Sequence, residues 1–466
     1  MDTFDVIVIG GGPAGENIAG RCDECDATVA IVEAELVGGE CSYWACEPSK
    51  ALLRPGAALA EVSRVPGAAA AVTGTIDAGA VFAWRDDIVS HYDDEPQASW
   101  VDRVGATLVR GHGRLVGERR VDVALPDGSV RALEAARAVV VATGSTAVIP
   151  PIDGLRDTRV WDNRAITSAS AVPERLIVLG GGVVGVEMAQ AWKRLGTREV
   201  TVIEALDRLV ANLEPFASDD LAAAFADDGI SVRLGSKAVK VERAGSADDG
   251  PVTVTLEDGS AITGDELLVS VGRRPNTSDL GVDSIGLEPG KAIEVDEHLR
   301  ATAVDGGWLY AIGDVNGRAL LTHMGKYQAR IVSDIILKGS TVTAWADHRA
   351  VPSVVFTDPQ VASVGLTEAK AREQGIDVRV VEYATNNTAG ANLYGTTSRG
   401  TSRLVIDESR RVIVGATFTG PLVGELLHAA TIAVVGEVTL DTLVHAVPSF
   451  PTVSEVWLRL LETYGL

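Results

Sequence analysis

The chain has 466 residues, of which 46% are hydrophobic and 49 are glycine, and a net charge of −23 at pH 7. This length exceeds one compact core and predicts about three domains, and the abundant glycine favours α/β layers with many tight turns. The acidic charge argues against nucleic acid or an anionic membrane as a partner, and four cysteines do not make a disulfide scaffold.

The N-terminal segment enters a strand at once, over residues 5–10, Asp-Val-Ile-Val-Ile-Gly. No basic region precedes this apolar run, which is too short for a signal peptide or a membrane span. We therefore expect a soluble, cytoplasmic protein without a membrane span. In that compartment a redox-active disulfide is more often catalytic than structural.

A first dinucleotide-binding unit follows this strand. A helix is predicted from residue 13 to about residue 25, and a strand over 27–33 ends at Glu33. The loop before the helix fits G-x-G-x-x-G, which permits a tight turn and close backbone approach to a pyrophosphate at the helix N-terminus. Glu33 can accept hydrogen bonds from ribose hydroxyls. The three glycines of the pattern are Gly10, Gly12 and Gly15.

The same order of elements returns over residues 175–204 and predicts a second dinucleotide site. Its strand, helix and strand are expected at 175–180, 183–195 and 200–204. Glu204 ends the second strand, which favours a ribose with a free 2′-hydroxyl and hence NADH. Arg208 could instead pair with a 2′-phosphate, although we interpret it as a solvated surface charge. The glycines of this loop are Gly180, Gly182 and Gly185.

Two cysteines, Cys41 and Cys46, lie in the segment Gly-Gly-Glu-Cys-Ser-Tyr-Trp-Ala-Cys-Glu-Pro-Ser-Lys of residues 38–50. No Cys/His cluster is nearby, so we expect a redox pair and no metal site. An ideal helix would separate the two Cα atoms by about 8–9 Å, whereas a disulfide wants less than about 7 Å. The backbone must therefore distort between them, and a strained disulfide is easier to reduce.

Charged residues flank this pair. Lys50 puts a cation near the reactive centre and favours a thiolate or a reduced flavin, whereas Glu40 and Glu47 raise the pKa of the thiols. Cys22 and Cys25 also form a C-x-x-C pattern, which we interpret as packing residues of the first helix.

Further elements are expected along the rest of the chain. Residues 138–144 predict a buried strand that runs into a turn at Thr143 and Gly144. The segments 269–276 and 309–314 are strand-then-glycine elements that could return to the first sheet. Beyond residue 347 the pattern predicts an α+β domain, with strands at 353–356, 401–406 and 412–419 and helices at 424–435 and 453–464.

Taken in this order, the motifs resemble the flavoprotein pyridine nucleotide–disulfide oxidoreductases, the family of lipoamide dehydrogenase, glutathione reductase and mercuric reductase. The resemblance covers essentially the whole chain. The matching segments are 10–15, 38–50, 142–144, 180–187, 272–276, 313–314 and 356–368.

The resemblance implies an α/β fold with two Rossmann-like dinucleotide-binding domains and a C-terminal α+β dimerisation domain. It implies a homodimer in which each active site is completed by the partner subunit. The implied divisions are an FAD-binding domain over 1–150 and 271–346, an NAD(P)-binding domain over 151–270 and an interface domain over 347–466.

The resemblance also implies roles for single residues. FAD would lie on the first unit, with Asp314, after Gly313, bonding its ribityl chain. Lys50 would stand near flavin N5 and pair with Glu187. Cys46 would be the charge-transfer thiol, and Cys41 would be the interchange thiol that meets the substrate.

The chain departs from the family where proton transfer is concerned. Phe450 occupies the position of the family's acid/base histidine, so Glu455, which would orient that histidine, has nothing to orient. His445 lies five residues upstream, and we interpret it as a surface or hinge residue. Thr322 and His323 replace an Ala-His pair on a helix whose N-terminus should face the flavin pyrimidine.

Losing general acid–base help costs a factor of about 10²–10⁴ in rate. We therefore expect an FAD-dependent NAD(P)H oxidoreductase that uses NAD(H) rather than NADP(H) and passes electrons through a redox-active Cys41–Cys46 disulfide. Its small-molecule acceptor would be a quinone, a metal ion or a disulfide that needs no histidine acid. One alternative is a dihydrolipoamide dehydrogenase in which His445 or water replaces the base. Another is a flavin-binding redox sensor without significant turnover.

Overall fold

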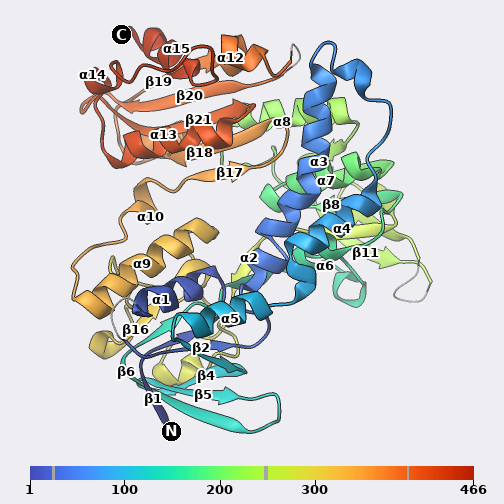
Figure 1. Cartoon of the computed structure of the whole chain (residues 1–466). Helices are drawn as coiled ribbons and strands as arrows, with labels where there is room; N and C mark the ends of the chain where they lie inside the picture. The colour runs from blue at the N-terminus through green and yellow to red at the C-terminus, as the bar shows by residue number, and fades with distance from the viewer. Residues whose placement is uncertain (24–26, 246–249, 396–397) are drawn as a thin grey trace. The chain divides into compact units, whose positions relative to one another are not determined.

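The computed structural model describes residues 1–23, 27–245, 250–395 and 398–466. The chain divides into two compact units (Figure 1). Unit 1 comprises Met1–Pro48, Asp86–Val148 and Gly272–Asp347, and unit 2 comprises Ser49–Arg85, Ile149–Val271 and His348–Leu466. In the described part of the chain, no helix has the length and apolar character needed to cross a membrane.

Unit 1 is built on a seven-stranded sheet. Residues 6–9 of its central strand are all buried, because parallel neighbours and covering layers exclude water from both faces. Val8 pairs with Ile31 on one side and with Val140 on the other. The strands run in the order β3 (Thr107–Arg110), β2 (Val29–Glu33), β1 (Asp2–Ile9), β6 (Val130–Val141), β5 (Arg120–Ala124) and β4 (His112–Gly117), and β16 (Leu309–Ala311) also pairs with β6.

Two helices of unit 1 position the site. Helix α1 (Pro13–Asp23) follows β1 through the glycine loop and packs against α9 (Thr322–Lys338), as Figure 1 shows. Arg21 on α1 donates to Asp334 on α9 at 2.6 Å. This ion pair joins the C-terminal parts of the two packed helices.

The segment 309–314 returns to the first sheet as expected, because β16 pairs with β6 in parallel. The same expectation for 269–276 is wrong. Val269 ends β14 (Glu266–Val269), which pairs with β8 (Arg175–Leu179) in the second sheet. Gly272, at φ +140°, then turns the chain into β15 (Arg273–Pro275), which pairs with β7 (Ser145–Ala147) in a two-stranded sheet.

Unit 2 contains the second nucleotide-type fold. Its parallel sheet has the order β10 (Ser231–Arg233), β9 (Glu199–Ile203), β8 and β14, and helices α7 (Val183–Leu195) and α8 (Pro215–Asp228) belong to it. The core centres on Trp192, whose ring lies 5.4 Å from Trp161 and 5.8 Å from Phe82. An antiparallel sheet of β11 (Ala238–Arg243), β12 (Val252–Leu256) and β13 (Ala261–Gly264) completes this part.

The C-terminal part of unit 2 is a five-stranded antiparallel sheet. All nine residues of its central strand, β21, are buried, because α13 (Val423–Val435) packs on it and on β18. Helix α15 (Glu455–Tyr464) packs against β19 and β20, the last two strands of the sheet order given next. The strand order is β17 (Ser353–Val355), β18 (Gln360–Gly365), β21 (Val412–Gly420), β20 (Thr401–Asp407) and β19 (Val378–Ala384).

These sheets confirm the predicted class, two dinucleotide-binding folds and a C-terminal α+β domain. The remaining helices are α2 (Gly39–Tyr43), α3 (Cys46–Arg64), α4 (Ala78–Ile88), α5 (Glu95–Arg103), α6 (Asn163–Ser168), α10 (Ala346–Arg349), α11 (Glu368–Glu373), α12 (Ala389–Asn392) and α14 (Leu440–Leu443).

The close approach of helix α7 to its glycine loop yields a first prediction. A Cβ on Gly185 would lie 1.9 Å from the carbonyl oxygen of Gly180, whereas a Cβ on Gly182 would meet nothing within 4 Å. We expect Gly185→Ala to lower the free energy of unfolding by roughly 2 kcal/mol or more. The matched variant Gly182→Ala should stay within about 0.5 kcal/mol of the wild type. Urea unfolding of both variants measures this, and equal stabilities would contradict the packing described.

Candidate active site

The two cysteines lie on separate helices. Helix α2 ends at Tyr43, Trp44 has a non-helical backbone (φ −135°, ψ 6°), and α3 begins at Cys46. The expected distortion between Cys41 and Cys46 is therefore confirmed. Both residues are half-buried, and their sulfurs are not bonded to each other.

The hydroxyl of Thr322 touches both sulfur atoms. Thr322 Oγ1 donates to Cys41 Sγ at 3.1 Å and lies 3.3 Å from Cys46 Sγ. Thr322 is the first residue of α9. From the sequence, this threonine is a departure from the family's alanine, and its contact with the thiols was not predicted.

The two neighbouring thiols disfavour the state in which both sulfurs are ionised. The pKa of Cys41 is raised, first by its hydrogen bond with Cys46, then by burial and by the charge of Cys46, while Thr322 lowers it. The charge of Glu47 raises it further, as expected. The carboxylate of Glu40 is instead bound by Arg273. Once one sulfur is ionised, the other therefore resists ionisation.

An aromatic residue braces the break between α2 and α3. The ring of Trp44 stacks on Tyr92, with centroids 6.2 Å apart and planes at 28°. Ser90, His91 and Tyr92 all adopt positive φ (50°, 52° and 61°), a left-handed run that costs about 1–2 kcal/mol per residue. Such strain persists only where surrounding contacts fix it, and it concentrates at functional sites.

An ion pair ties the same loop to the entry of α2. Asp94 accepts from Arg110 at 2.5 and 2.8 Å and from the backbone N–H of Val37 at 2.6 Å. The hydroxyl of Tyr43 donates to the carbonyl of Val37 at 3.1 Å. The backbone around the cysteine break is therefore held from both sides.

The first glycine loop is fixed by the acid at the end of β2. Gly11 N–H donates to Glu33 Oε2 at 2.7 Å, and Glu35 N–H donates to Glu33 Oε1 at 2.7 Å. Gly10 has φ +110°, and a Cβ on Gly15 would lie 2.0 Å from the oxygen of Gly10. Burial raises the pKa of Glu33. Backbone approach and an open helix N-terminus are the features that an FAD pyrophosphate requires, so these residues fit that cofactor.

The second loop repeats the first one contact by contact. Gly181 N–H donates to Glu204 Oε2 at 2.6 Å, and Leu206 N–H donates to Glu204 Oε1 at 2.8 Å. Gly180 has φ +108°. Arg208 turns back onto its own loop and donates to the carbonyl of Ala211 at 2.6 Å. This loop fits a pyridine nucleotide by the same criteria.

Asp314 lies in a polar cluster of unit 1. Ser145 Oγ donates to Asp314 Oδ2 at 2.5 Å, and Arg273 Nε donates to Ser145 Oγ at 2.7 Å. Burial raises the pKa of Asp314. Ser145 and Arg273 were not predicted as site residues, although Ser145 follows Gly144 and Arg273 lies in the matching segment 272–276.

The turn between β6 and β7 is closed by Asn276. Thr143 Oγ1 donates to the carbonyl of Asn276 at 2.8 Å, and Asn276 Nδ2 donates to the carbonyl of Thr143 at 3.0 Å. Gly144, at φ +69°, permits this turn. His323 is exposed in the first turn of α9, directly after Thr322.

Unit 2 holds the pair Lys50 and Glu187. Lys50 Nζ donates to Glu187 Oε2 at 2.8 Å, and Glu187 Oε1 accepts from the backbone N–H of Phe356 at 2.9 Å. The ammonium of Lys50 also lies 4.9 Å from the centre of the Phe356 ring. Glu187 is 3% exposed, so its buried charge needs this cation.

Glu455 has partners, contrary to the expectation that it has nothing to orient. Its Oε2 accepts from the backbone N–H of Ala389 at 2.9 Å, and its Oε1 accepts from Arg459 at 2.7 Å. It therefore anchors the N-terminus of α12 rather than an imidazole. Phe450 is 75% exposed, and His445 is exposed just after α14.

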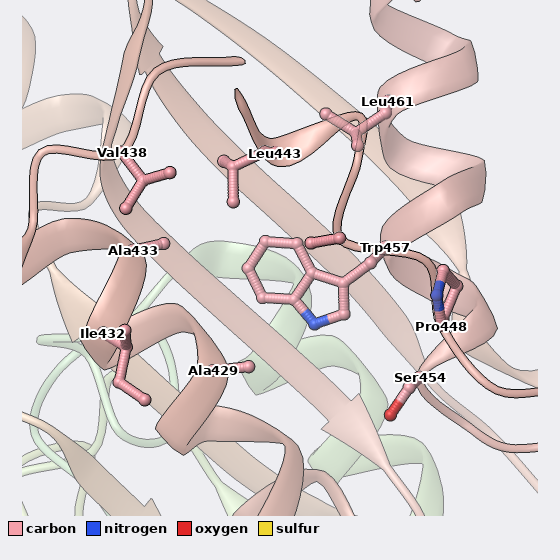
Figure 2. A pocket seen from close by; sticks show the side chains of 10 residues that line it. Ala429, Ile432, Ala433, Val438, Leu443, Pro448, Ser454, Trp457 and Leu461 are labelled. Carbon is pink, nitrogen blue, oxygen red and sulfur yellow. The ribbon is translucent and has the colours of Figure 1, made fainter. Parts of the chain in front are cut away.

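An apolar pocket of about 400 Å³ lies between α13 and α15 (Figure 2). Ile432 and Ala433 of α13 face Trp457 and Leu461 of α15 across it. Trp457 packs on Phe418 of β21, with ring centres 5.8 Å apart. Ile432, which lines this pocket, is 57% exposed.

The structure thus brings part of the predicted site together in each unit. Cys25 and the side chain of Cys22 lie outside the described residues. Within the described residues, no cluster of three or more His, Cys, Asp or Glu could hold a metal ion. Unit 1 holds Gly10, Gly12, Gly15, Glu33, Cys41, Cys46, Thr143, Gly144, Gly313, Asp314 and His323, and unit 2 holds Lys50, Gly180, Gly182, Gly185, Glu187, Glu204, Phe450 and Glu455.

A pH-sensitive carboxyl lies beside the first loop. Burial raises the pKa of Glu16, in the first turn of α1, from 4.5 to about 7, while Lys326 lowers it and Glu33 raises it. Between these two pH values the native state holds a proton that the unfolded state has lost.

We therefore expect the free energy of unfolding to fall as pH rises from 4.5 to about 7, by about 3 kcal/mol, and to level off above that range. Glu16→Gln should remove this part of the slope. Denaturant unfolding across this range measures it, and identical pH profiles of wild type and variant would contradict the assignment.

The family model described as pyridine nucleotide-disulphide oxidoreductase matches residues 4–329, and the model of that family's dimerisation domain matches residues 351–460. A dihydrolipoyl dehydrogenase of Thermus scotoductus is 33% identical over 469 residues, covering 99% of this chain and 97% of that protein. A mercuric reductase of Shigella flexneri is also 33% identical, over 465 residues, covering 99% and 80%.

Solved structures agree in fold. The crystal structure of LpdA from Mycobacterium tuberculosis is 26% identical, covers all of both chains and has a TM-score of 0.87. The flavoprotein disulfide reductase RclA from Escherichia coli is 24% identical over 99% of both chains, with a TM-score of 0.86, which shows the shared fold alone. The chain therefore belongs to the pyridine nucleotide-disulfide oxidoreductase family, whose members are enzymes that bind FAD and a pyridine nucleotide.

Proposed function

We propose that this enzyme takes electrons from NADH and delivers them, through FAD and the Cys41–Cys46 pair, to an acceptor that needs no histidine acid. The observation that carries the proposal is the helix break that brings both thiols to one hydroxyl, within the unit that holds the Gly10 loop. The acceptor would be a quinone, a metal ion or a disulfide with a low-pKa leaving thiol.

FAD, when bound, accepts a hydride from the pyridine nucleotide and exchanges two electrons with the disulfide. The N–H groups at the start of α1 would bind its pyrophosphate, and Gly15 would let the backbone approach. Asp314, held by Ser145, would accept from a ribityl hydroxyl. Glu33 keeps the loop in shape through its bonds to Gly11 and Glu35 and can accept from the ribose.

Lys50 would present a fixed positive charge to the reduced flavin. Glu187 holds the ammonium at 2.8 Å and is itself fixed by the Phe356 amide. A cation in this role stabilises negative charge as it develops. His323, in the first turn of α9, would lie where the helix dipole favours the same sign of charge.

The thiol pair would cycle between a disulfide and the dithiol state. Two electrons break the S–S bond, one proton is taken up, and one sulfur remains an anion. We assign Cys46 to the flavin side and Cys41 to the acceptor. Electrostatic coupling between the sulfurs supports a single shared charge, because the second ionisation is disfavoured.

The residues around Phe450 support an acceptor without acid catalysis. A phenyl ring cannot transfer a proton, and Glu455 bonds Ala389 and Arg459 instead of an imidazole. A second candidate is dihydrolipoamide dehydrogenase, which the name of the Thermus scotoductus relative favours. That activity would require His445 or water as the base. A flavin-binding redox sensor is the third candidate.

The second loop supports NADH over NADPH. Glu204 follows the second strand of this fold, a position from which an acid would repel a 2′-phosphate. Arg208 is committed to the Ala211 carbonyl and is thereby drawn away from such a phosphate.

We further propose a homodimer that closes over the C-terminal domain. A dimerisation-domain model matches residues 351–460. Large apolar side chains are exposed there, with Val447 at 83% and Phe450 at 75%. A second copy covering this face would remove them from water. We also propose that residues 1–150 and 271–346 bind FAD, 151–270 bind NAD(P) and 347–466 form the interface.

Anaerobic titration tests the electron path. We expect NADH to bleach the flavin and, after two electrons, to give a long-wavelength absorption band, because a Cys46 thiolate then lies against an oxidised ring. NADPH should reduce the flavin at least tenfold more slowly, because Glu204 would repel its 2′-phosphate. A tenfold difference in rate corresponds to about 1.4 kcal/mol in activation free energy. Cys46→Ser should abolish the band. Flavin reduction without the band in the wild type would contradict the role of the thiols.

Steady-state assays separate the candidates. We expect turnover with quinones or metal ions to exceed turnover with lipoamide or glutathione disulfide by about 10²-fold or more, because the missing acid costs that factor. Strong lipoamide turnover that falls in His445→Ala would favour the dehydrogenase instead. Rapid flavin reduction with no turnover on any of these acceptors would favour the sensor.

A further inference from the structure

One side-chain hydroxyl lies between the two redox cysteines. Thr322 Oγ1 donates to Cys41 Sγ at 3.1 Å and stands 3.3 Å from Cys46 Sγ, where either atom can be the donor. Both distances are within the range for hydrogen bonds to sulfur. Thr322 comes 281 residues after Cys41, so the fold and not the local sequence makes this contact.

A hydroxyl in this position can transfer a proton. It has one O–H donor and two acceptor lone pairs. If Cys41 is the anion, the Cys46 S–H donates to Thr322 Oγ1 while the threonine proton passes to Cys41. Cys46 is then the anion, the threonine has its proton back, and no atom or charge has been gained or lost.

The surroundings of Thr322 favour an anion next to it. Thr322 is the first residue of α9, a helix of 17 residues, whose N-terminal partial positive charge stabilises negative charge nearby. Helix α1 packs against α9, and Arg21 bonds Asp334 in the C-terminal half of α9. The position of the hydroxyl relative to the two sulfurs is given by its contacts with both of them.

We propose that Thr322 is a positioning residue that passes one proton between Cys41 and Cys46 and stabilises whichever sulfur carries the charge. The inference rests on the proposed redox role of the pair. The transfer moves one proton between the two sulfurs inside unit 1 and leaves the proton exchange with the acceptor to other groups.

Four further ionisable residues lie close to the cysteines or to Thr322 in the sequence. Glu47, at the start of α3, opposes the anion, and Glu40, beside Cys41, is paired with Arg273. His323 follows Thr322 on α9, and Lys50 follows Cys46 on α3. Because all four stay unchanged in Thr322 variants, a shift between variants reports on the hydroxyl.

The test is alkylation of the thiols across a pH series. The FAD-loaded enzyme is reduced with dithiothreitol, desalted anaerobically and treated with iodoacetamide, and the modification of Cys41 and Cys46 is read separately by tandem mass spectrometry. Thr322→Val removes the hydroxyl at nearly constant shape, and Thr322→Ser keeps it. Thr322→Ala is the second variant without a hydroxyl, should valine unfold the protein.

We expect Thr322→Val, or Thr322→Ala, to raise the pH midpoint of alkylation by about one unit, a tenfold slower reaction below the midpoint. Thr322→Ser should keep the wild-type midpoint. A valine or alanine midpoint equal to wild type overturns the proposal, and so does a serine midpoint shifted as far as valine. Since dithiothreitol replaces NADH, failure of the NADH titration would count against the proposed function alone.

Discussion

The structure around the candidate site depends on one break in a helix. A continuous helix through residues 39–64 would hold the Cα atoms of Cys41 and Cys46 about 8–9 Å apart. The non-helical Trp44 separates α2 from α3 and lets the two sulfurs interact. The break is fixed by stacking on Tyr92 and by Asp94, so its geometry belongs to the folded unit and not to the cysteine segment alone.

The two nucleotide loops share one hydrogen-bond pattern. In the first loop, one oxygen of Glu33 accepts from the N–H of Gly11 and the other from the N–H of Glu35. In the second loop, Glu204 accepts in the same way from Gly181 and Leu206. The carboxylates thus shape the loop before any ribose is present. Charged acceptors give the stronger class of hydrogen bond, so each loop is stiff enough to present its amides to a pyrophosphate.

Features with a local physical cause could be predicted from the sequence. The glycine loops, the strand that ends at Glu33, the strand that Glu204 directly follows and the distortion between the cysteines all follow from spacing and backbone geometry. The prediction for segment 269–276 was wrong about the sheet, because an apolar run that ends in glycine does not determine which strands will pair with it.

The ion pair of Lys50 and Glu187, 137 positions apart, was predicted from the family resemblance and is confirmed. Other contacts between distant segments could not be predicted. Thr322 meets Cys41 across 281 positions, and Glu455 meets Ala389 across 66. The left-handed backbone at Ser90, His91 and Tyr92 contains no glycine, so the sequence gives no sign of it. Tertiary contacts balance the strain of this segment. The identity of the electron acceptor depends on molecules outside the chain. The sequence limits the choice of acceptors only through Phe450, which cannot transfer a proton.

The central claim is that Cys41 and Cys46 form one reversible disulfide. The direct measurement is the state of both thiols in glutathione redox buffers, with acid quenching, alkylation and mass spectrometry. The account predicts a single two-electron transition in which both thiols disappear together into a bond between Cys41 and Cys46. Thiols that stay reduced in every buffer, or that oxidise independently of each other, would contradict it.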